Sequence, residues 1–177
     1  MELDPSFDDF VLRKSARLLR TAYLLTGDPG HAEDLLQVAL VRTARHWARA
    51  RDAPAAYAHR VLINLMHDRN RRVARRAIEQ PLDDHDVARR SVVDHAELVI
   101  DHDAIIRAIK LLSRRQREVM VLRFFADLSV SETADAIGSS PGSVKTHTNR
   151  ALARLHELLA DDPETPNHQI TEVSGAD

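Results

Sequence analysis

The sequence predicts an all-α protein made of two small helical domains joined by a flexible acidic linker, the second domain containing a helix-turn-helix. Apolar residues recur every three or four positions along most of the chain, and no segment shows the alternation typical of a strand. Basic residues form two blocks on either side of an acidic stretch. We therefore place the first domain at residues 6–76, the linker at 77–102, the second domain at 103–160 and an acidic, disordered tail at 161–177.

The first domain is expected to contain three helices with short connections. Ser6 is a candidate N-cap for the first helix. The glycine- and proline-containing residues 26–30 predict a turn, after which a second amphipathic helix has Trp47 on its apolar face. A short break near residues 52–54 precedes a third helix at about residues 55–76. Trp47 is therefore expected in the core.

The second domain is expected to contain four helices. Isoleucines at residues 105–109 mark the first, and Ser113 and Gln116 have the spacing of a capping box that opens the second. The two remaining helices carry the clearest local signals of the chain and are considered below with the helix-turn-helix.

Composition excludes several classes of protein. The chain has 177 residues, of which 44% are apolar and 29% charged, and no apolar run reaches the roughly 18 residues needed to span a bilayer. The N-terminus lacks the basic and apolar segments of a secretory signal, so we expect a cytoplasmic protein without membrane insertion. Cysteine is absent, and no glycine-rich phosphate loop is present. We expect no enzymatic activity and no cofactor.

The overall net charge of −2 hides a segregation of charge along the chain. Residues 6–76 have a net charge of +7, residues 77–102 of −5, and residues 103–160 of +3. Two basic blocks separated by an acidic segment indicate two modules that meet a polyanion.

The third helix has an unusual distribution of residues. At 100° per residue, Arg60, Asn64, His67, Arg71 and Arg75 lie in one stripe. The opposite stripe is apolar and consists of Ala58, Val61, Leu62 and Leu65. A helix buried on one side and rich in Arg, Asn and His on the other suits contact with a nucleic-acid backbone and bases. The alternative is a solvated helix with an arginine-rich surface.

The segment from Ser129 onwards predicts a helix-turn-helix. Ser129 and Glu132 form a capping box, Gly138 ends the short helix, and Ser140-Pro141 supplies an N-cap and first-turn proline for a longer helix. The expected core-facing stripe of that helix is Val144, Ala151, Leu155 and Leu158. The residues offered to a major groove are Ser143, Lys145, Thr146, Asn149 and Arg150. The alternative is an ordinary helical hairpin with a polar surface.

Two histidine- and aspartate-containing clusters, at residues 84–86 and 101–103, have residue types that suit zinc or iron. A metal site needs a rigid frame, and at least the first cluster lies in the predicted linker. We therefore favour a solvated acidic linker and expect no metal site.

The chain resembles bacterial sigma factors at several places. Residues 32–37 (AEDLLQ) are similar to the helix that binds the polymerase clamp, and residues 56–72 are similar to the helix that melts promoters and reads the −10 element. Residues 112–124 and 131–145 resemble the region that reads the −35 element. The arrangement is similar to that of the short, two-domain extracytoplasmic function (ECF) sigma factors, particularly the actinobacterial SigE-like group, over residues 6–160.

The resemblance implies residue roles. The residues implied to contact the β′ clamp helices of RNA polymerase are Glu33, Asp34, Leu36, Gln37 and Leu40. Those implied to hold and separate the −10 strands are Arg60, Asn64, Arg71 and Arg72, beside a loop at residues 48–56 that receives a flipped base. Those implied to read the −35 duplex are Ser143, Lys145, Thr146, Asn149 and Arg150.

The function implied is that of an alternative-type sigma factor, which directs RNA polymerase core to specific promoters and assists promoter melting. The implied partners are the β′ clamp helices and β flap of the core, and promoter DNA. Many ECF members also bind an anti-sigma factor, and the sequence leaves open whether this chain does. Two other hypotheses are a helix-turn-helix regulator acting without polymerase core and, more distantly, a metal-dependent hydrolase built on the Asp/His clusters.

Overall fold

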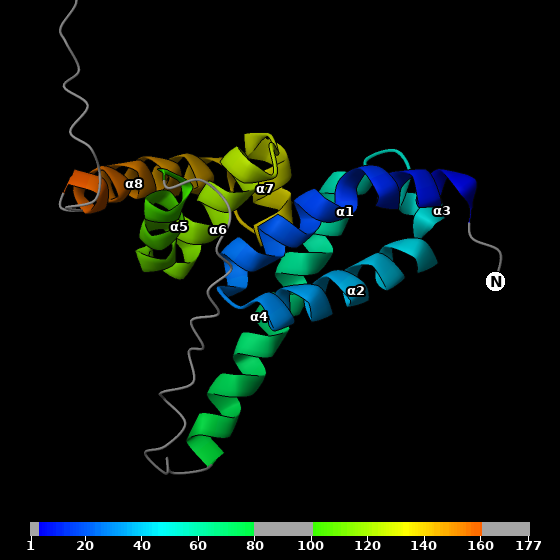
Figure 1. Cartoon of the computed structure of the whole chain (residues 1–177), viewed down its shortest axis with the longest axis horizontal. Coiled ribbons are helices and arrows are strands. Elements are labelled where there is room, and N and C mark those ends of the chain that lie inside the picture. Colours follow the sequence, from blue (N-terminus) through cyan, green and yellow to red (C-terminus); the bar gives the residue numbers. More distant parts are fainter. Residues whose placement is uncertain (1–3, 80–100, 161–177) are drawn as a thin grey trace, which may run out of the picture.

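A computed structural model describes residues 4–79 and 101–160, and every regular element in these ranges is a helix (Figure 1). The N-terminal domain contains α1 (Pro5–Thr26), α2 (Pro29–Arg45), α3 (Trp47–Ala50) and α4 (Pro54–Glu79). The C-terminal domain contains α5 (Asp101–Leu111), α6 (Arg114–Met120), the π-helix η1 (Val121–Phe125), α7 (Val130–Ile137) and α8 (Pro141–Ala160). Most of the expected linker and the whole expected tail lie outside the described residues.

The first helix begins earlier than predicted, because its N-cap is Asp4 and not Ser6. The Asp4 carboxylate accepts a hydrogen bond from the Ser6 backbone amide at 2.9 Å, while Pro5 occupies the first turn. The Ser6 hydroxyl also donates to the Asp4 carboxylate, at 2.6 Å, and this bond, followed by the one from the Ser6 amide, lowers the pKa of Asp4 below its usual value. The oxygen of the Ser6 hydroxyl accepts a hydrogen bond from the indole N–H of Trp47 at 2.9 Å, which links the start of α1 to Trp47.

The turn after α1 is as predicted. Gly27 adopts the left-handed conformation with φ of +73° and ends α1, and Asp28 caps α2 by accepting a hydrogen bond from the His31 amide at 2.7 Å. Pro29 then starts α2. The short connection makes α1 and α2 antiparallel neighbours (Figure 1).

The end of the second predicted helix differs from the expectation. α2 stops at Arg45, and Trp47 begins the separate one-turn helix α3. Trp47 is nevertheless buried, as predicted, and its indole meets the Phe7 ring edge-on with ring centroids 5.1 Å apart. Phe10 joins this aromatic group at 5.5 Å from Trp47. The group closes the end of the domain where α1 begins.

In the C-terminal domain the local signals give the observed caps. The Ser113 amide donates to the Gln116 side chain at 3.1 Å, and the Ser129 amide donates to Glu132 at 2.8 Å. The hydrogen bond from the Ser129 amide is the main reason that the pKa of Glu132 lies below its usual value. Gly138 ends α7 at φ of +63°. The sequence did not predict that α6 continues as the π-helix η1.

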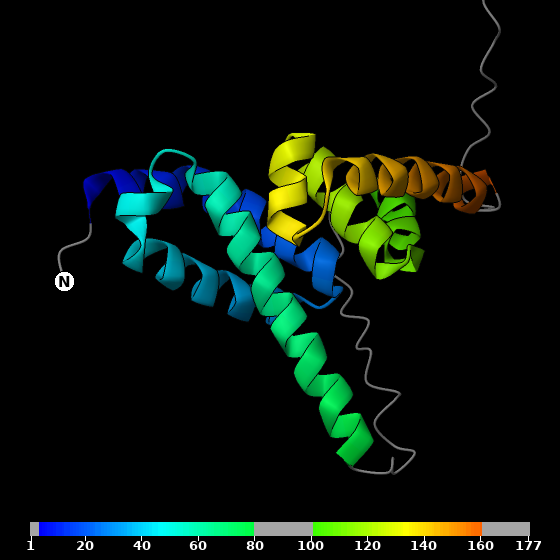
Figure 2. The ribbon, with the colours of Figure 1, turned by 180° about the vertical axis from the view of Figure 1, so that it is seen from behind.

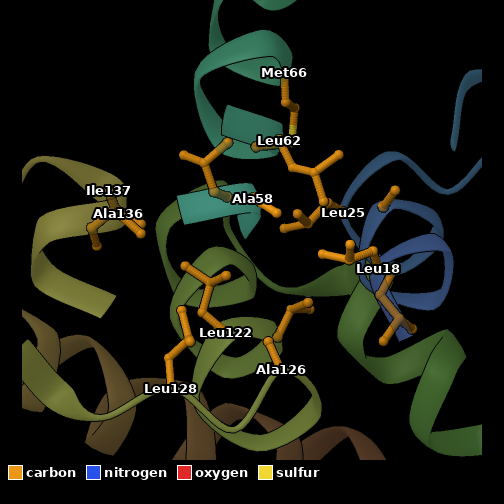
Figure 3. Packing of buried hydrophobic residues seen from close by; sticks show 14 of the residues in the cluster. Leu18, Leu25, Ala58, Leu62, Met66, Leu122, Ala126, Leu128, Ala136 and Ile137 are labelled. Carbon is orange, nitrogen blue, oxygen red and sulfur yellow. The ribbon is translucent and has the colours of Figure 1, made fainter. Parts of the chain in front are cut away.

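The two domains pack against each other. α4 lies along α7, and α1 contacts both η1 and α5 (Figure 2). Figure 3 shows one apolar cluster formed by side chains from both domains. Its labelled members are Leu18, Leu25, Ala58, Leu62 and Met66 from the N-terminal domain, and Leu122, Ala126, Leu128, Ala136 and Ile137 from the C-terminal domain.

Candidate nucleic-acid and polymerase interfaces

α4 presents an exposed polar face with a buried apolar face behind it. The exposed residues include all four that were assigned to the −10 element: Arg60, Asn64, Arg71 and Arg72. Ala58 and Leu62 are almost completely buried on the other side, and Val61 is 9% exposed. The guanidinium of Arg60 lies 5.3 Å from the ring centroid of Tyr57, in the first turns of α4. The expected loop at residues 48–56 is shorter than predicted, because Trp47–Ala50 form α3 and α4 already begins at Pro54.

Two polar side chains of α4 point away from its exposed polar face and contact other helices. His67, which the helical wheel placed in the arginine stripe, turns towards the C-terminal domain, where its Nε2 lies 2.8 Å from Oε1 of Glu118. Arg69 donates from Nη2 to Nε2 of His31 on α2 at 2.7 Å. The interpretation of His67 as part of the nucleic-acid stripe is therefore wrong, because a partner 51 residues further along the chain decides its direction.

α2 places the residues assigned to the polymerase clamp on its outer face. Glu33, Asp34 and Gln37 are exposed, and Leu36 and Leu40 are half-buried. Sequence reasoning missed the neighbouring valines of this face: Val38 is 43% exposed and Val41 is 51% exposed. Val41 lies one helical turn beyond Gln37, and this four-residue spacing could have placed Val41 on the same face from the sequence. The face thus combines carboxylates with open aliphatic side chains.

α8 has the geometry expected of the second helix of a helix-turn-helix. Val144, Ala151 and Leu155 are buried against α6 and α7, as predicted, and Leu158 is partly buried. On the opposite face Lys145, Thr146, Asn149 and Arg150 are exposed, and Ser143 is half-buried.

The first turn of α8 is held by serine side chains. The Ser143 amide donates to Oγ of Ser140 at 3.1 Å, which gives Ser140 the N-capping role predicted for it. Ser140 Oγ also donates to Ser143 Oγ at 3.1 Å, and the Thr146 hydroxyl donates back to the Gly142 carbonyl at 3.1 Å. Among the five residues assigned to the −35 element, Lys145, Asn149 and Arg150 have the longest exposed side chains.

A buried histidine supports α4 from within the domain and was not singled out from the sequence. His59 is 2% exposed; its Nδ1 donates to the Ala55 carbonyl at 2.7 Å, and its Nε2 lies 3.4 Å from the Thr21 hydroxyl. Burial, the largest cause, lowers the pKa of His59 to about 4. The ring is therefore neutral at physiological pH and acts as a polar part of the core.

Among the side chains that the structure describes, no group of three or more His, Asp or Glu residues is arranged to hold a metal ion. The cluster at residues 84–86 lies outside the described residues. None of the helices described is long and apolar enough to cross a bilayer.

Comparisons with known proteins agree with both halves of this arrangement. Residues 10–76 match the family model of sigma-70 region 2, and residues 102–155 match that of sigma-70 region 4. The chain is 41% identical over 155 residues to the RNA polymerase sigma-E factor of Streptomyces avermitilis, covering 86% of this chain and 84% of that protein. It is 33% identical over 156 residues to the ECF RNA polymerase sigma factor SigM of Mycobacterium tuberculosis, covering 87% and 77%.

A solved structure extends the similarity to three dimensions. The sigma factor RpoE from Bartonella quintana, crystallised with the anti-sigma factor NepR, superposes with a TM-score of 0.72 at 27% identity, covering 88% of this chain and 98% of that one. A helix-turn-helix regulator acting without polymerase is not favoured, because the matches include region 2 as well as region 4. The chain belongs to the sigma-70 family and is an ECF sigma factor, an alternative transcription initiation factor that acts with RNA polymerase at promoters.

Proposed function

We propose that this sigma factor binds RNA polymerase core through α2, and places α4 on the −10 element and α8 on the −35 element of one promoter. In this scheme it catalyses no bond chemistry and acts in the cytoplasm. The domain limits remain those proposed from the sequence, residues 6–76 and 103–160. The observation that supports the proposal is that three separate helices expose the residue types each contact needs while burying their apolar faces.

On α4, the proposed role is to hold and separate the −10 strands. Arg71 and Arg72 are exposed and lie on the half of α4 that extends past the body of the N-terminal domain (Figure 1). Arg71 is ion-paired with Asp68, which keeps its guanidinium near the helix surface. Guanidinium groups in this position bind phosphates of a separated strand. Arg60 and Asn64 lie nearer the segment of residues 48–56, which consists of the end of α3, a short connection and the start of α4. A flipped base would be received at this segment.

On α8, the proposed role is to read duplex DNA in the major groove. Lys145 and Arg150 supply charge for phosphates or guanine edges, and Asn149 supplies an amide that pairs with adenine. Ser143 and Thr146 lie in the first two turns, where the positive end of the helix dipole faces the DNA backbone. Each domain makes few contacts alone, so their combined binding depends on the polymerase holding both in place.

The proposed partners are the β′ clamp helices for the outer face of α2, the β flap for the C-terminal domain, and promoter DNA. Glu33, Asp34 and Gln37 offer polar contacts, and Leu36 and Leu40 offer apolar area beside them. An anti-sigma factor is a further proposed partner, because the related RpoE protein was solved with one bound.

The experiment that tests this function uses purified core polymerase and the full chain. Run-off transcription from a genomic promoter library, read by sequencing, should yield transcripts with shared −10 and −35 sequences only when both components are present. Size-exclusion chromatography should show co-elution of the chain with core. If the chain elutes alone and binds palindromic DNA as a dimer, the proposal is overturned in favour of a polymerase-independent regulator.

A further inference from the structure

The apolar support of α4 ends near the middle of the helix. Leu62 and Met66 are buried, but none of the α4 side chains that the structure describes after Met66 is buried, and Val73 is 56% exposed. The helix nevertheless continues to Glu79, past the body of the N-terminal domain (Figure 1). The direction of this projecting half, residues 70–79, therefore depends on contacts other than apolar burial.

A hydrogen bond joins α4 to α2 close to the point where this burial ends. Nη2 of Arg69 donates to Nε2 of His31 at 2.7 Å. The start of α2 lies beside this part of α4 in both views of the ribbon (Figure 1 and Figure 2). Arg69 is half-buried, whereas Arg71 and Arg72 are exposed. Among the described residues, this is the last hydrogen bond along α4 that reaches another helix.

His31 is itself held by Asp28, the N-cap of α2. The backbone amide of His31 donates to Oδ1 of Asp28 at 2.7 Å, and the ring Nδ1 lies 3.3 Å from the same oxygen. A guanidinium has only donors, so Nε2 of His31 is the acceptor of the bond from Arg69. The ring proton is then on Nδ1, where it faces the Asp28 carboxylate. Asp28, His31 and Arg69 thus form a continuous chain from the N-cap of α2 to α4.

The other polar contacts of this part of α4 cannot fix its direction within the N-terminal domain. The ion pair between Asp68 and Arg71 lies within α4, so it holds a side chain and not the helix. The bond from His67 reaches Glu118, which lies on α6 of the C-terminal domain. Arg69 is therefore the residue that links the projecting half of α4 to its own domain.

We propose that Arg69 is a positioning residue: bound to His31, it fixes the direction of the projecting half of α4 relative to α2. Arg71 and Arg72 follow Arg69 by about 3 and 4.5 Å along the helix axis, so a change in the direction of α4 moves them away from the strand that they bind. The proposed function places α2 on polymerase core, and the consequence at the promoter rests on that function. The anchoring of α4 to α2 does not.

Two substitutions of His31 separate its hydrogen bond from the shape of its side chain. His31→Phe keeps an aromatic ring and removes the acceptor, whereas His31→Gln supplies an amide oxygen that can accept from Arg69. Arg69→Ala removes the donor. The matched controls are His156→Phe on α8 and Arg13→Ala on α1, because both change exposed side chains elsewhere in the chain.

The first measurement follows the direction of α4 in the free protein. Since the sequence contains no cysteine, Leu12→Cys on α1 and Val73→Cys on α4, both at exposed positions, give two unique sites for spin labels. Pulsed electron paramagnetic resonance gives the distribution of the distance between the labels. We expect a narrow distribution in the parent, the controls and His31→Gln, and a broader one in His31→Phe and Arg69→Ala. Equal widths in all of these proteins would overturn the anchoring, whatever the chain does at a promoter.

The second measurement uses the holoenzyme. Open-complex formation should slow about fivefold in His31→Phe and in Arg69→Ala, because each loses one half-exposed, charge-assisted hydrogen bond. His31→Gln should restore most of the rate, and core affinity should match that of the controls throughout. The variant that combines His31→Phe with Arg69→Ala should be no slower than either alone, since both changes remove the same bond.

The salt dependence of promoter binding distinguishes an anchor from a DNA contact. With Arg69 as an anchor, Arg69→Ala should leave the slope of log affinity against log salt equal to that of the parent. A slope shallower by about 0.9, or losses that add in the combined variant, would make Arg69 a phosphate contact and overturn the proposal. If core does not bind at all, the proposed function fails, and the distances in the free protein still decide whether α4 is anchored.

Discussion

α4 and α8 both turn a polar face to solvent, yet the two faces differ in charge. Residues 60–76 of α4 contain six arginines and one aspartate, whereas the first ten residues of α8 contain only Lys145 and Arg150 among shorter polar side chains. A dense cationic face suits phosphates of a strand whose bases have been separated, because such binding depends on charge. A sparse face of amide and hydroxyl groups suits base edges in an intact groove.

The two domains also differ in what holds their helices. The N-terminal domain buries three aromatic rings, Phe7, Phe10 and Trp47, together with the neutral His59. The C-terminal domain relies more on backbone caps, with Ser113, Ser129 and Gly138 setting the ends of short helices. The first kind of support depends on contacts between distant residues, and the second on residues a few positions apart.

The largest expected effect is on the cationic face of α4. Replacing Arg71 and Arg72 together with Ala should reduce open-complex formation about a hundredfold or more, because two charge-assisted contacts of about 1.5–3 kcal/mol each are lost. Core binding should stay nearly unchanged, since the residues assigned to core lie on α2. Permanganate footprinting of the melted strand and co-elution with core measure the two quantities.

The control for this prediction is Arg13→Ala, which removes an arginine from the exposed surface of the same domain. On a template whose −10 region is already mismatched, the double variant should recover much of its activity, because melting is no longer required. Promoter opening equal to that of the parent would remove Arg71 and Arg72 from the −10 role.

The second prediction concerns the buried histidine of the N-terminal domain. His59 has a pKa of about 4 in the folded chain, whereas the ordinary value is 6.5. The unfolded chain therefore binds a proton first as pH falls, and the free energy of unfolding should decrease between about pH 6.5 and pH 4 and level off below. A shift of this size corresponds to about 3 kcal/mol.

His59→Gln should remove that part of the pH dependence while losing stability at pH 7. Urea unfolding of the parent and the variant from pH 7.5 to pH 4 measures it, and His156→Gln, an exposed position on α8, is the matched control. An unchanged difference in stability between parent and His59→Gln across this range would contradict the assignment.

Local sequence rules predict part of this fold and part of the candidate site. The caps at Ser129, Glu132 and Gly138 were predicted because their partners lie three or four residues away and local rules apply. The buried stripe of α8 followed from helical periodicity in the same way. The exposed residues of α4 also followed from periodicity, with one exception, His67. Its partner, Glu118, lies in the other domain, and no local pattern indicates such a contact.

The remaining differences have similar physical causes. Asp4 competes with Ser6 for the N-cap of α1, and Pro5 decides between them because it fits the first helical turn and has no amide to satisfy. The π-helix η1 differs from an α-helix by a single shift in hydrogen bonding, which side-chain periodicity over five residues does not reveal. The packing of the two domains depends on apolar residues that periodicity assigned to separate cores.

The smallest expected effect is on the sparse face of α8. Replacing Lys145 and Arg150 with Ala should weaken −35 binding about tenfold, because both side chains are exposed and each contributes a solvent-screened contact. If both bind phosphates, the slope of log affinity against log salt should become shallower by about 1.8. Holoenzyme binding to promoter DNA at several salt concentrations measures both quantities. On a promoter whose −35 element has been scrambled, the variant and the parent should perform alike, since the contacts removed are already absent there. An equal loss on both promoters would mean that these residues act outside the −35 element, and α8 would then resemble α4 in relying on charge alone.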